Sequence, residues 1–216
     1  MVSEKLVLHG ESNYESPYVF SAFVALKEKG LAFELRLHSL QSGEHRRGEY
    51  LERSLTGRVP ALEHGDFWLS ESSAIDEYLE DVFPPPDWPA LYPARPRDRA
   101  RARQVQAWLR SDLMALRAQR PTSSFLSGEP VKPLDAEGRN AAAHLLEVAF
   151  SLVPEGGGFL FGAFSIADVD LAMMLLRLIG NGDAVAAKLR AYAQAVWGRP
   201  SVREFVEHPR PPRGAR

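Results

Sequence analysis

The 216-residue sequence predicts an α/β domain followed by an all-helical domain. Before residue 84, short apolar runs alternate with helical patterns, and after residue 96 only helical patterns follow. Between them, residues 84–96 contain six prolines in thirteen positions, which neither a helix interior nor a central strand tolerates. We therefore expect an α/β domain at 1–84, a proline-rich linker at 85–96 and a helical domain at 97–216.

The first domain begins with an expected strand-helix-strand unit. Residues 5–9 read as a strand, a helix starts at Ser16-Pro17 and ends at Gly30, and residues 32–37 alternate as a second strand. A strand, a helix and a strand that follow one another so closely predict that the two strands are parallel. The pattern continues with a polar loop at 38–48, a helical turn near 49–54, hairpin strands at 61–63 and 67–69, and a helix at 71–82.

The second domain reads as helices at 95–119, 135–152, 166–179, 184–196 and 201–207. The third of these is apolar almost all round, so we expect it in the core. Ser165 and Asp168 at its start match a capping box, which is a structural motif.

Composition and charge exclude several classes of function. Lys and Arg total 26 against 28 Asp and Glu, and the arginines near residues 95–103 alternate around their helix, so we expect no nucleic-acid partner. The longest apolar stretch, residues 169–179, is interrupted by Asp170 and Arg177 and is shorter than the roughly 20 residues that cross a bilayer. No targeting segment is visible, and we expect a cytoplasmic protein without a membrane partner.

The sequence contains no cysteine, which excludes disulfides and thiolate zinc sites. Its six histidines show no metal-ligand spacing, and it has no glycine-rich phosphate loop. We expect no metal and no tightly bound cofactor. Any thiol chemistry must use the thiol of a bound ligand.

The order of elements and four local patterns resemble the cytosolic glutathione transferases. These patterns are Ser-Pro-Tyr-Val at the first helix, Arg-Val-Pro before the third strand, Leu-Ser-Glu-Ser-Ser-Ala-Ile at the next helix and Ser-Ile-Ala-Asp before the buried helix. Ser-Gly-Glu-His and Arg-Ala-Arg-Gln-Val-Gln-Ala-Trp-Leu-Arg-Ser-Asp-Leu-Met add a likeness to the bacterial YfcF-like transferases. The resemblance implies a thioredoxin-like glutathione-binding domain and a helical bundle that shapes the second substrate site.

Ser16 is the candidate catalytic residue. Ser before Pro is a favoured helix start, so a structural role alone would account for the pair. A hydroxyl at a helix N-terminus also suits a thiolate, because the helix dipole favours negative charge there. A free thiol has a pKa of roughly 8.5, which such surroundings lower. The resemblance implies Ser16 as the group that activates glutathione, with Ser12, Tyr14 and Tyr18 as nearby alternatives.

The resemblance also implies glutathione contacts at two further places. Val59-Pro60 resembles the superfamily's cis-proline, and Val59 would pair through its backbone with the cysteinyl part of glutathione. Glu71 would meet the ligand's ammonium, and Ser72 with the free amides of its helix would hold the γ-glutamyl carboxylate.

Two further assignments are less constrained. The glycine carboxylate of glutathione needs a cation, for which His45, Arg46, Arg47 and Arg58 are candidates, His45 being slightly favoured. Arg103, Gln106 and Arg110 share one helix face. Arg103 and Arg110 are equally well explained as charges for a second substrate and as interdomain salt bridges.

The resemblance implies a glutathione S-transferase that directs the thiol of its co-substrate to an electrophile or a hydroperoxide, and a two-fold homodimer. The alternatives are a glutathione-binding scaffold without turnover and a glutathione-dependent isomerase. Cysteine-based exchange is excluded because the chain has no cysteine. The Ser-Ser-Cys-Ser-x-Arg-Val-Arg signature of maleylacetoacetate isomerases is replaced here by Glu-Ser-Asn-Tyr-Glu-Ser-Pro-Tyr-Val, which counts against that isomerase.

Overall fold

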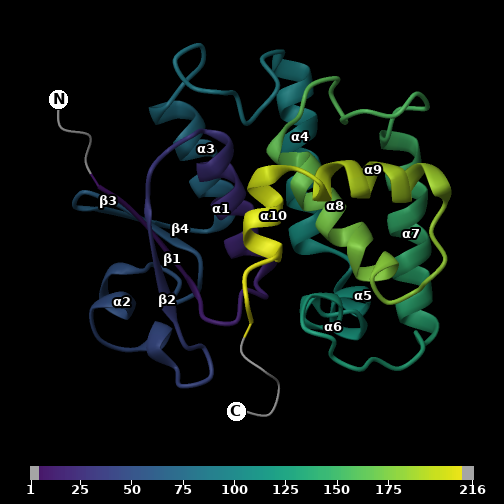
Figure 1. Cartoon of the computed structure of the whole chain (residues 1–216), viewed down its shortest axis with the longest axis horizontal. Helices are drawn as coiled ribbons and strands as arrows, with labels where there is room; N and C mark the ends of the chain where they lie inside the picture. Colours follow the sequence, from purple (N-terminus) through teal and green to yellow (C-terminus); the bar gives the residue numbers. More distant parts are fainter. Residues whose placement is uncertain (1–4, 211–216) are drawn as a thin grey trace. The chain divides into compact units, whose positions relative to one another are not determined.

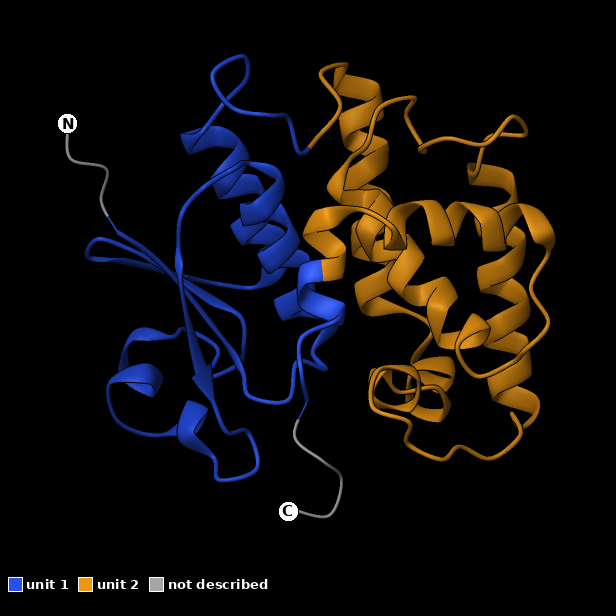
Figure 2. Cartoon of the chain, viewed as in Figure 1, with its two compact units in different colours: residues 1–91, 204–216 blue, residues 92–203 orange. Residues whose placement is uncertain are grey.

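The computed structural model describes residues 5–210. The chain forms two compact units (Figure 2). The first unit combines the chain up to Leu91 with the segment from Glu204 onward, and the helical unit comprises Tyr92–Arg203. The first unit is therefore discontinuous in sequence.

The first unit is built on a four-stranded sheet with the strand order β2-β1-β3-β4 (Figure 1). The strands are β1 (Leu6–Glu11), β2 (Glu34–His38), β3 (Ala61–His64) and β4 (Phe67–Ser70). β1 pairs in parallel with β2 and antiparallel with β3, and β3 pairs antiparallel with β4. The strand-helix-strand unit and the hairpin predicted from the sequence are confirmed.

Two helices pack together in the first unit, α1 (Pro17–Glu28) and α3 (Ser72–Val82). α1 approaches β1 at Gly10, where an added Cβ would lie 2.9 Å from Val19 Cγ1. That close approach explains why a glycine stands in the central strand. The polar loop contains the short helix α2 (Gly48–Arg53), as expected, and a 3₁₀ turn, η1 (Glu44–Arg46), that the sequence did not predict.

A buried ion pair joins the end of α1 to α3. Lys29 Nζ lies 2.6 Å from Glu80 Oε2 and donates to the Phe83 carbonyl at 2.7 Å. The same carboxylate oxygen accepts the Leu91 N–H at 2.9 Å. Since both charged side chains are almost fully buried, every donor and acceptor in this cluster needs its partner.

The helical unit contains α4 (Pro96–Ser111), α5 (Met114–Gln119), α6 (Thr122–Leu126), α7 (Ala136–Leu152), α8 (Ile166–Ile179), α9 (Ala187–Trp197) and the start of α10 (Pro200–Val206). Every residue of α8 up to Leu178 is buried, which confirms its expected core position. The predicted capping box is present at its start, where Asp168 Oδ2 accepts the Ser165 N–H at 2.9 Å.

The expected single helix over 95–119 is wrong, because the chain breaks between α4 and α5. Asp112 accepts the Leu113 N–H on its own side chain at 2.6 Å, and this local bond competes with the helical ladder. Leu113 adopts a left-handed backbone with φ 61° and buries its side chain. The burial of Leu113 compensates for this unfavourable conformation.

Candidate functional site

Ser16 is the N-cap of α1, as expected from the sequence. Its backbone is extended, its Oγ accepts the Val19 N–H at 3.3 Å, and Pro17 follows in the first helical position. The hydroxyl is half-buried at the positive end of the helix dipole. Ser16 therefore combines a helix cap with an accessible O–H donor.

The strand register brings the other predicted contacts to the same end of the sheet. Ala61 is paired with His9 of β1 and with Ser70 of β4. The Val59–Pro60 bond, which is cis as expected, comes just before Ala61, and Glu71 comes just after Ser70. Because β1 runs on from His9 to Glu11 and the turn before Ser16, three segments distant in sequence meet at one edge.

Glu71 and Ser72 form the start of α3. Glu71 is the exposed N-cap residue, with φ 72° and ψ 115°, and Ser72 is buried in the first turn. The left-handed φ of a non-glycine residue is uncommon and clusters at functional sites. A hydroxyl, helix-start amides and a carboxylate thus lie close together in sequence, which suits a ligand that carries both an ammonium and a carboxylate.

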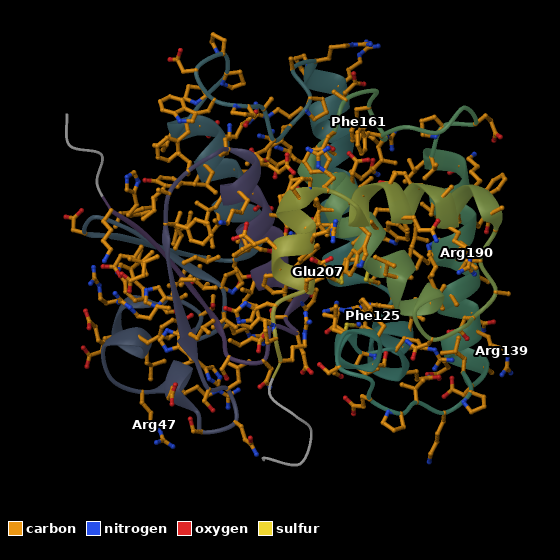
Figure 3. The ribbon with its side chains drawn as sticks, in the orientation of Figure 1. Arg47, Phe125, Arg139, Phe161, Arg190 and Glu207 are labelled. Atoms are coloured by element: carbon orange, nitrogen blue, oxygen red, sulfur yellow. The ribbon has the colours of Figure 1, made fainter. Side chains whose placement is uncertain are left out.

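The loop residues expected to hold the glycine end differ in burial. His45 in η1 is only 8% exposed, and its Nδ1 has no hydrogen-bond partner within the described part of the chain. Burial, with a smaller effect of Arg46, lowers the pKa of His45, so its ring is neutral near pH 7. His45 can therefore offer a hydrogen bond but no positive charge. The other candidates, Arg46, Arg47 (Figure 3) and Arg58, are exposed and can offer a positive charge.

The loop that carries these residues is tied to the sheet by hydroxyl groups. Tyr50 of α2 donates to the Arg58 carbonyl at 2.6 Å. Ser54 Oγ lies 3.1 Å from Ser70 Oγ, and both serines are buried. Arg58 is thereby held through its backbone while its side chain remains in solvent.

Two residues missed by the sequence reasoning surround Ser16. Glu11 is 4% exposed, and its carboxylate accepts the backbone N–H groups of Asn13, at 2.6 Å, and Ser16, at 2.8 Å, as well as that of Glu15. Arg210 donates to the Tyr14 carbonyl from Nη2 at 3.0 Å and from Nε at 3.3 Å. An acidic residue before a Ser-Pro pair is a weak sequence signal for Glu11, whereas no sequence pattern links Arg210 to Tyr14.

Among the nearby alternatives to Ser16, Tyr14 is engaged in packing and Ser12 is held through its backbone. The Tyr14 ring is 7% exposed and stacks on His208, with ring centroids 3.7 Å apart. Burial, and to a smaller extent Glu11, raises the pKa of Tyr14, which makes it harder to ionise. Ser12 donates its N–H to the His38 carbonyl at 3.0 Å.

The two arginines expected near a second substrate lie on α4 of the helical unit. Arg110 forms an ion pair with Asp170 of α8, with Nη1 2.7 Å from Oδ2. Gln106 donates to the same oxygen at 2.8 Å and accepts from the Tyr92 hydroxyl. Arg110 therefore forms a salt bridge, which is one of its two expected explanations, and Asp170 belongs to the same helical unit. Arg103 is exposed on this helix.

The described residues contain no group of three or more His, Cys, Asp or Glu side chains arranged to hold a metal ion. No helix among them has the length and hydropathy needed to cross a membrane.

Family models match both halves of the chain. The model of the glutathione S-transferase N-terminal domain matches residues 15–82, and that of the C-terminal domain matches residues 96–209. Human glutathione S-transferase theta-1 is 33% identical over 191 residues, which cover 82% of this chain and 76% of that protein. Glutathione S-transferase 4 of Zea mays is 48% identical over 64 residues, only 29% of its own length and 30% of this chain.

Solved structures agree with these matches. A glutathione transferase homolog from Burkholderia, crystallised with bound glutathione, matches with a TM-score of 0.79 and 41% identity over 94% of this chain and 97% of that one. A maleylacetoacetate isomerase from Methylobacterium extorquens, with bound malonate and glutathione, matches with a TM-score of 0.71 and 28% identity over 95% and 98% of the two chains. A four-stranded mixed sheet, a helical unit and family matches to both halves lead to one conclusion: the chain belongs to the cytosolic glutathione S-transferase superfamily.

Proposed function

We propose that this protein is a glutathione S-transferase that binds glutathione at the sheet edge formed by Ser16, Val59-Pro60 and Glu71-Ser72. The observation that carries the proposal is the strand register, which supports bringing together an O–H donor, helix-start amides and a carboxylate from separate segments. The bound glutathione of the Burkholderia homolog supports the choice of ligand. A cytoplasmic location belongs to the same proposal, because the cytosol keeps glutathione reduced.

Each part of glutathione has a partner in this proposal. Glu71 pairs with the ammonium, and Ser72 with the amides of the first turn of α3 holds the γ-glutamyl carboxylate. The backbone of Val59 pairs with the cysteinyl residue, with Pro60 as its support. Arg58 supplies the positive charge for the glycine carboxylate, and His45 adds a neutral hydrogen bond.

The sulfur of the bound ligand then lies beside Ser16. The Ser16 O–H donates to the thiolate, and the dipole of α1 favours the negative charge. Both effects lower the pKa of the thiol and raise the fraction of nucleophile near neutral pH.

Two reactions follow from an activated thiolate. With a carbon electrophile, the sulfur donates its electron pair to form an S–C bond, and the leaving group departs with its own pair. With a hydroperoxide, the sulfur takes the terminal oxygen to give a sulfenic acid and an alcohol. A second glutathione thiol then attacks that sulfur and releases water, leaving glutathione disulfide. Arg103 and Arg110 are the proposed neighbours of the second substrate.

Calorimetric titration with reduced glutathione is the first test, because absence of binding would remove the proposal. We then expect Ser16→Ala to bind glutathione with little change in Kd while kcat falls by about 10²-fold or more. Ser151→Ala, an exposed serine of α7, is the matched control and should behave as the wild type. Unchanged turnover in Ser16→Ala would transfer the role to Ser12, Tyr14 or Tyr18, which Ser12→Ala, Tyr14→Phe and Tyr18→Phe would separate.

The likeness to a maleylacetoacetate isomerase supports a glutathione-dependent isomerase as the second candidate. An isomerase regenerates glutathione in each cycle, whereas a transferase consumes it. Thiol consumption measured beside conversion of maleylacetoacetate therefore separates the two. Binding without turnover of any electrophile or of maleylacetoacetate would instead support a scaffold.

We also propose a homodimer that joins the first unit of one copy to the helical unit of another. The first unit carries Leu55, which is 95% exposed, and the helical unit has an apolar cavity of about 260 Å³ between α4 and α7. Val105, Trp108 and Val148 are among its lining residues. Sedimentation should give a dimer that Leu55→Asp weakens, with Leu40→Asp as the exposed control. A monomeric wild type would contradict this part of the proposal.

A further inference from the structure

A buried negative charge lies directly beneath the proposed catalytic turn. The Glu11 carboxylate accepts hydrogen bonds from the backbone N–H groups of Asn13, Glu15 and Ser16. These bonds fix the turn that presents the Ser16 hydroxyl. The Glu11 Oε1 is only 2.8 Å from the Ser16 nitrogen. A carboxylate this close opposes formation of a thiolate at Ser16, since like charges disfavour ionisation.

The C-terminal segment brings a positive charge to the same turn. After α10 the chain runs beside the turn that follows β1 (Figure 1), in the region where Figure 3 labels Glu207. Arg210 donates twice to the Tyr14 carbonyl, which lies between the Asn13 and Glu15 amides that Glu11 binds. The guanidinium also interacts electrostatically with Glu11 and Glu15.

Arg210 is itself fixed in place. Its Nη1 donates to the Val206 carbonyl at 2.7 Å and to the His208 carbonyl at 3.3 Å. The His208 ring stacks on the Tyr14 ring, so the segment holds the turn by a ring contact and by a cation. Tyr14 has a left-handed φ of 55°, and the contacts on both sides of it maintain that conformation.

We propose that Arg210 is a positioning residue for the proposed glutathione chemistry: its guanidinium, held on the Tyr14 carbonyl, offsets the charge of Glu11 so that a thiolate can form at Ser16. This inference rests on the proposed function, because it concerns the ionisation of glutathione bound there. If Arg210 only held the turn in place, its loss would affect stability and binding. A charge effect of Arg210 instead changes the pH at which the bound thiol ionises. The groups that surround this position are Glu11 of β1, Tyr14 and Glu15 of the turn, and His208 and Arg210 of the C-terminal segment.

The test is a pH titration of thiolate ultraviolet absorbance in the glutathione complex, made alongside kcat and KM over the same pH range. In Arg210→Gln we expect the pKa of the bound thiol to rise by about one unit, because the Glu11 charge is no longer offset. Below that pKa, kcat should fall about tenfold and recover at high pH, with little change in the KM for glutathione. Arg210→Lys should restore most of the wild-type profile.

Three further variants separate the effect of the Arg210 charge from that of the contacts that hold the turn in place. His208→Ala removes the ring contact and keeps the cation, so its thiol should titrate as in the wild type. Arg190→Gln removes an arginine from α9 of the helical unit (Figure 3) and controls for the loss of one positive charge. Glu11→Gln should lower the pKa of the bound thiol and reduce the effect of Arg210→Gln in the double variant. Urea unfolding of each variant shows that the compared proteins are folded.

The outcomes are distinct. If the wild type binds no glutathione, the proposed function fails and this inference fails with it. If the wild type ionises the bound thiol and Arg210→Gln does so at the same pH, only the role of Arg210 is overturned. If Arg210→Gln does not fold, an unchanged thiol pKa in Glu11→Gln overturns the charge argument by itself.

Discussion

At the residue scale, His9 lies at the centre of a buried polar cluster in the first unit. Its Nδ1 is 2.9 Å from His38 Nε2, its Nε2 is 3.3 Å from Glu63 Oε2, and its ring lies against Trp68. With Glu63 ionised, His9 donates from Nε2 and accepts the His38 N–H at Nδ1, which requires a neutral ring. Burial is the main cause that lowers the pKa of His9 to about 4, although the Glu63 bond opposes it.

The depressed pKa of His9 predicts a loss of stability in mild acid. Between pH 6.5 and 4 the unfolded chain binds a proton at His9 that the folded chain excludes, so the free energy of unfolding falls as the pH falls. Over that window the loss from this one group reaches about 3 kcal/mol. Urea unfolding from pH 7 to 4.5 should show this slope reduced in His9→Gln. His144→Gln, an exposed histidine of α7, serves as the control, and equal slopes in all three proteins would contradict the assignment.

The candidate site was only partly predictable from single residues. Ser16, Val59-Pro60 and Glu71-Ser72 are adjacent to helix starts and strand ends, so local patterns mark them. Glu11 has only a weak local signal, although its contacts to Asn13 and Ser16 are close in sequence. Arg210 has none, because its contact with Tyr14 joins residues 196 positions apart. The burial of His45, which makes Arg58 the preferred cation in our proposal, is a tertiary property that the sequence does not show.

At the scale of elements, the Lys29–Glu80 pair fixes α1 to α3 through buried charges. We expect Lys29→Met to destabilise the protein by about 3–5 kcal/mol, because Glu80 would keep an unpaired buried charge. The double variant Lys29→Met/Glu80→Gln should recover part of this loss, because glutamine is neutral and still accepts the Leu91 N–H. Chemical unfolding measures both. A double variant less stable than the single one would show that the remaining charge is not the cause.

Lys27→Met provides the matched control for that experiment. Lys27 also belongs to α1 and pairs with Glu204 at 2.6 Å, but both side chains are substantially exposed. Exposed pairs contribute about 1 kcal/mol or less, so the contrast isolates the effect of burial.

The capping residue of α8 supports a second prediction for an element. Asp168 is fully buried and accepts from Ser165, from the Leu160 N–H and from the Tyr192 hydroxyl, both at 2.9 Å. Asp168→Ala leaves these donors without an acceptor, and we expect a loss of at least about 3 kcal/mol. Thermal unfolding should show Asp168→Asn to be less damaging. The exposed Glu137→Ala in the first turn of α7 should change little, and a comparable effect there would contradict the capping argument.

The elements themselves followed the sequence patterns closely, with three exceptions that have physical causes. η1 has three residues and α6 has five, and neither was predicted because helical periodicity does not show over so short a segment. The break at Asp112-Leu113 interrupts a sequence whose pattern is otherwise continuously helical. It depends on the burial of the Leu113 side chain, which is a tertiary property.

At the scale of the whole molecule, the first unit depends on a segment that follows the helical unit in sequence. Phe205 is 1% exposed, and its ring packs against the rings of Tyr14, Phe20 and Phe23. Phe205→Ala should therefore cost about 3–5 kcal/mol. Hydrogen–deuterium exchange should show faster exchange in β1 and α1 than in the wild type, with α8 unchanged. Phe67→Ala, at a 44% exposed position of the same unit, is the control, and protection in β1 equal to the wild type would contradict the prediction.

The discontinuity of the first unit also has a consequence for biosynthesis. A ribosome releases β1 and the Ser16 turn early, but Phe205 and Arg210 emerge only after the entire helical unit has been translated. Nascent chains generally fold domain by domain in the order of synthesis. Here the unit translated first cannot be completed first, because its aromatic core and the Ser16 turn lack Phe205 and Arg210 until the helical unit has been translated.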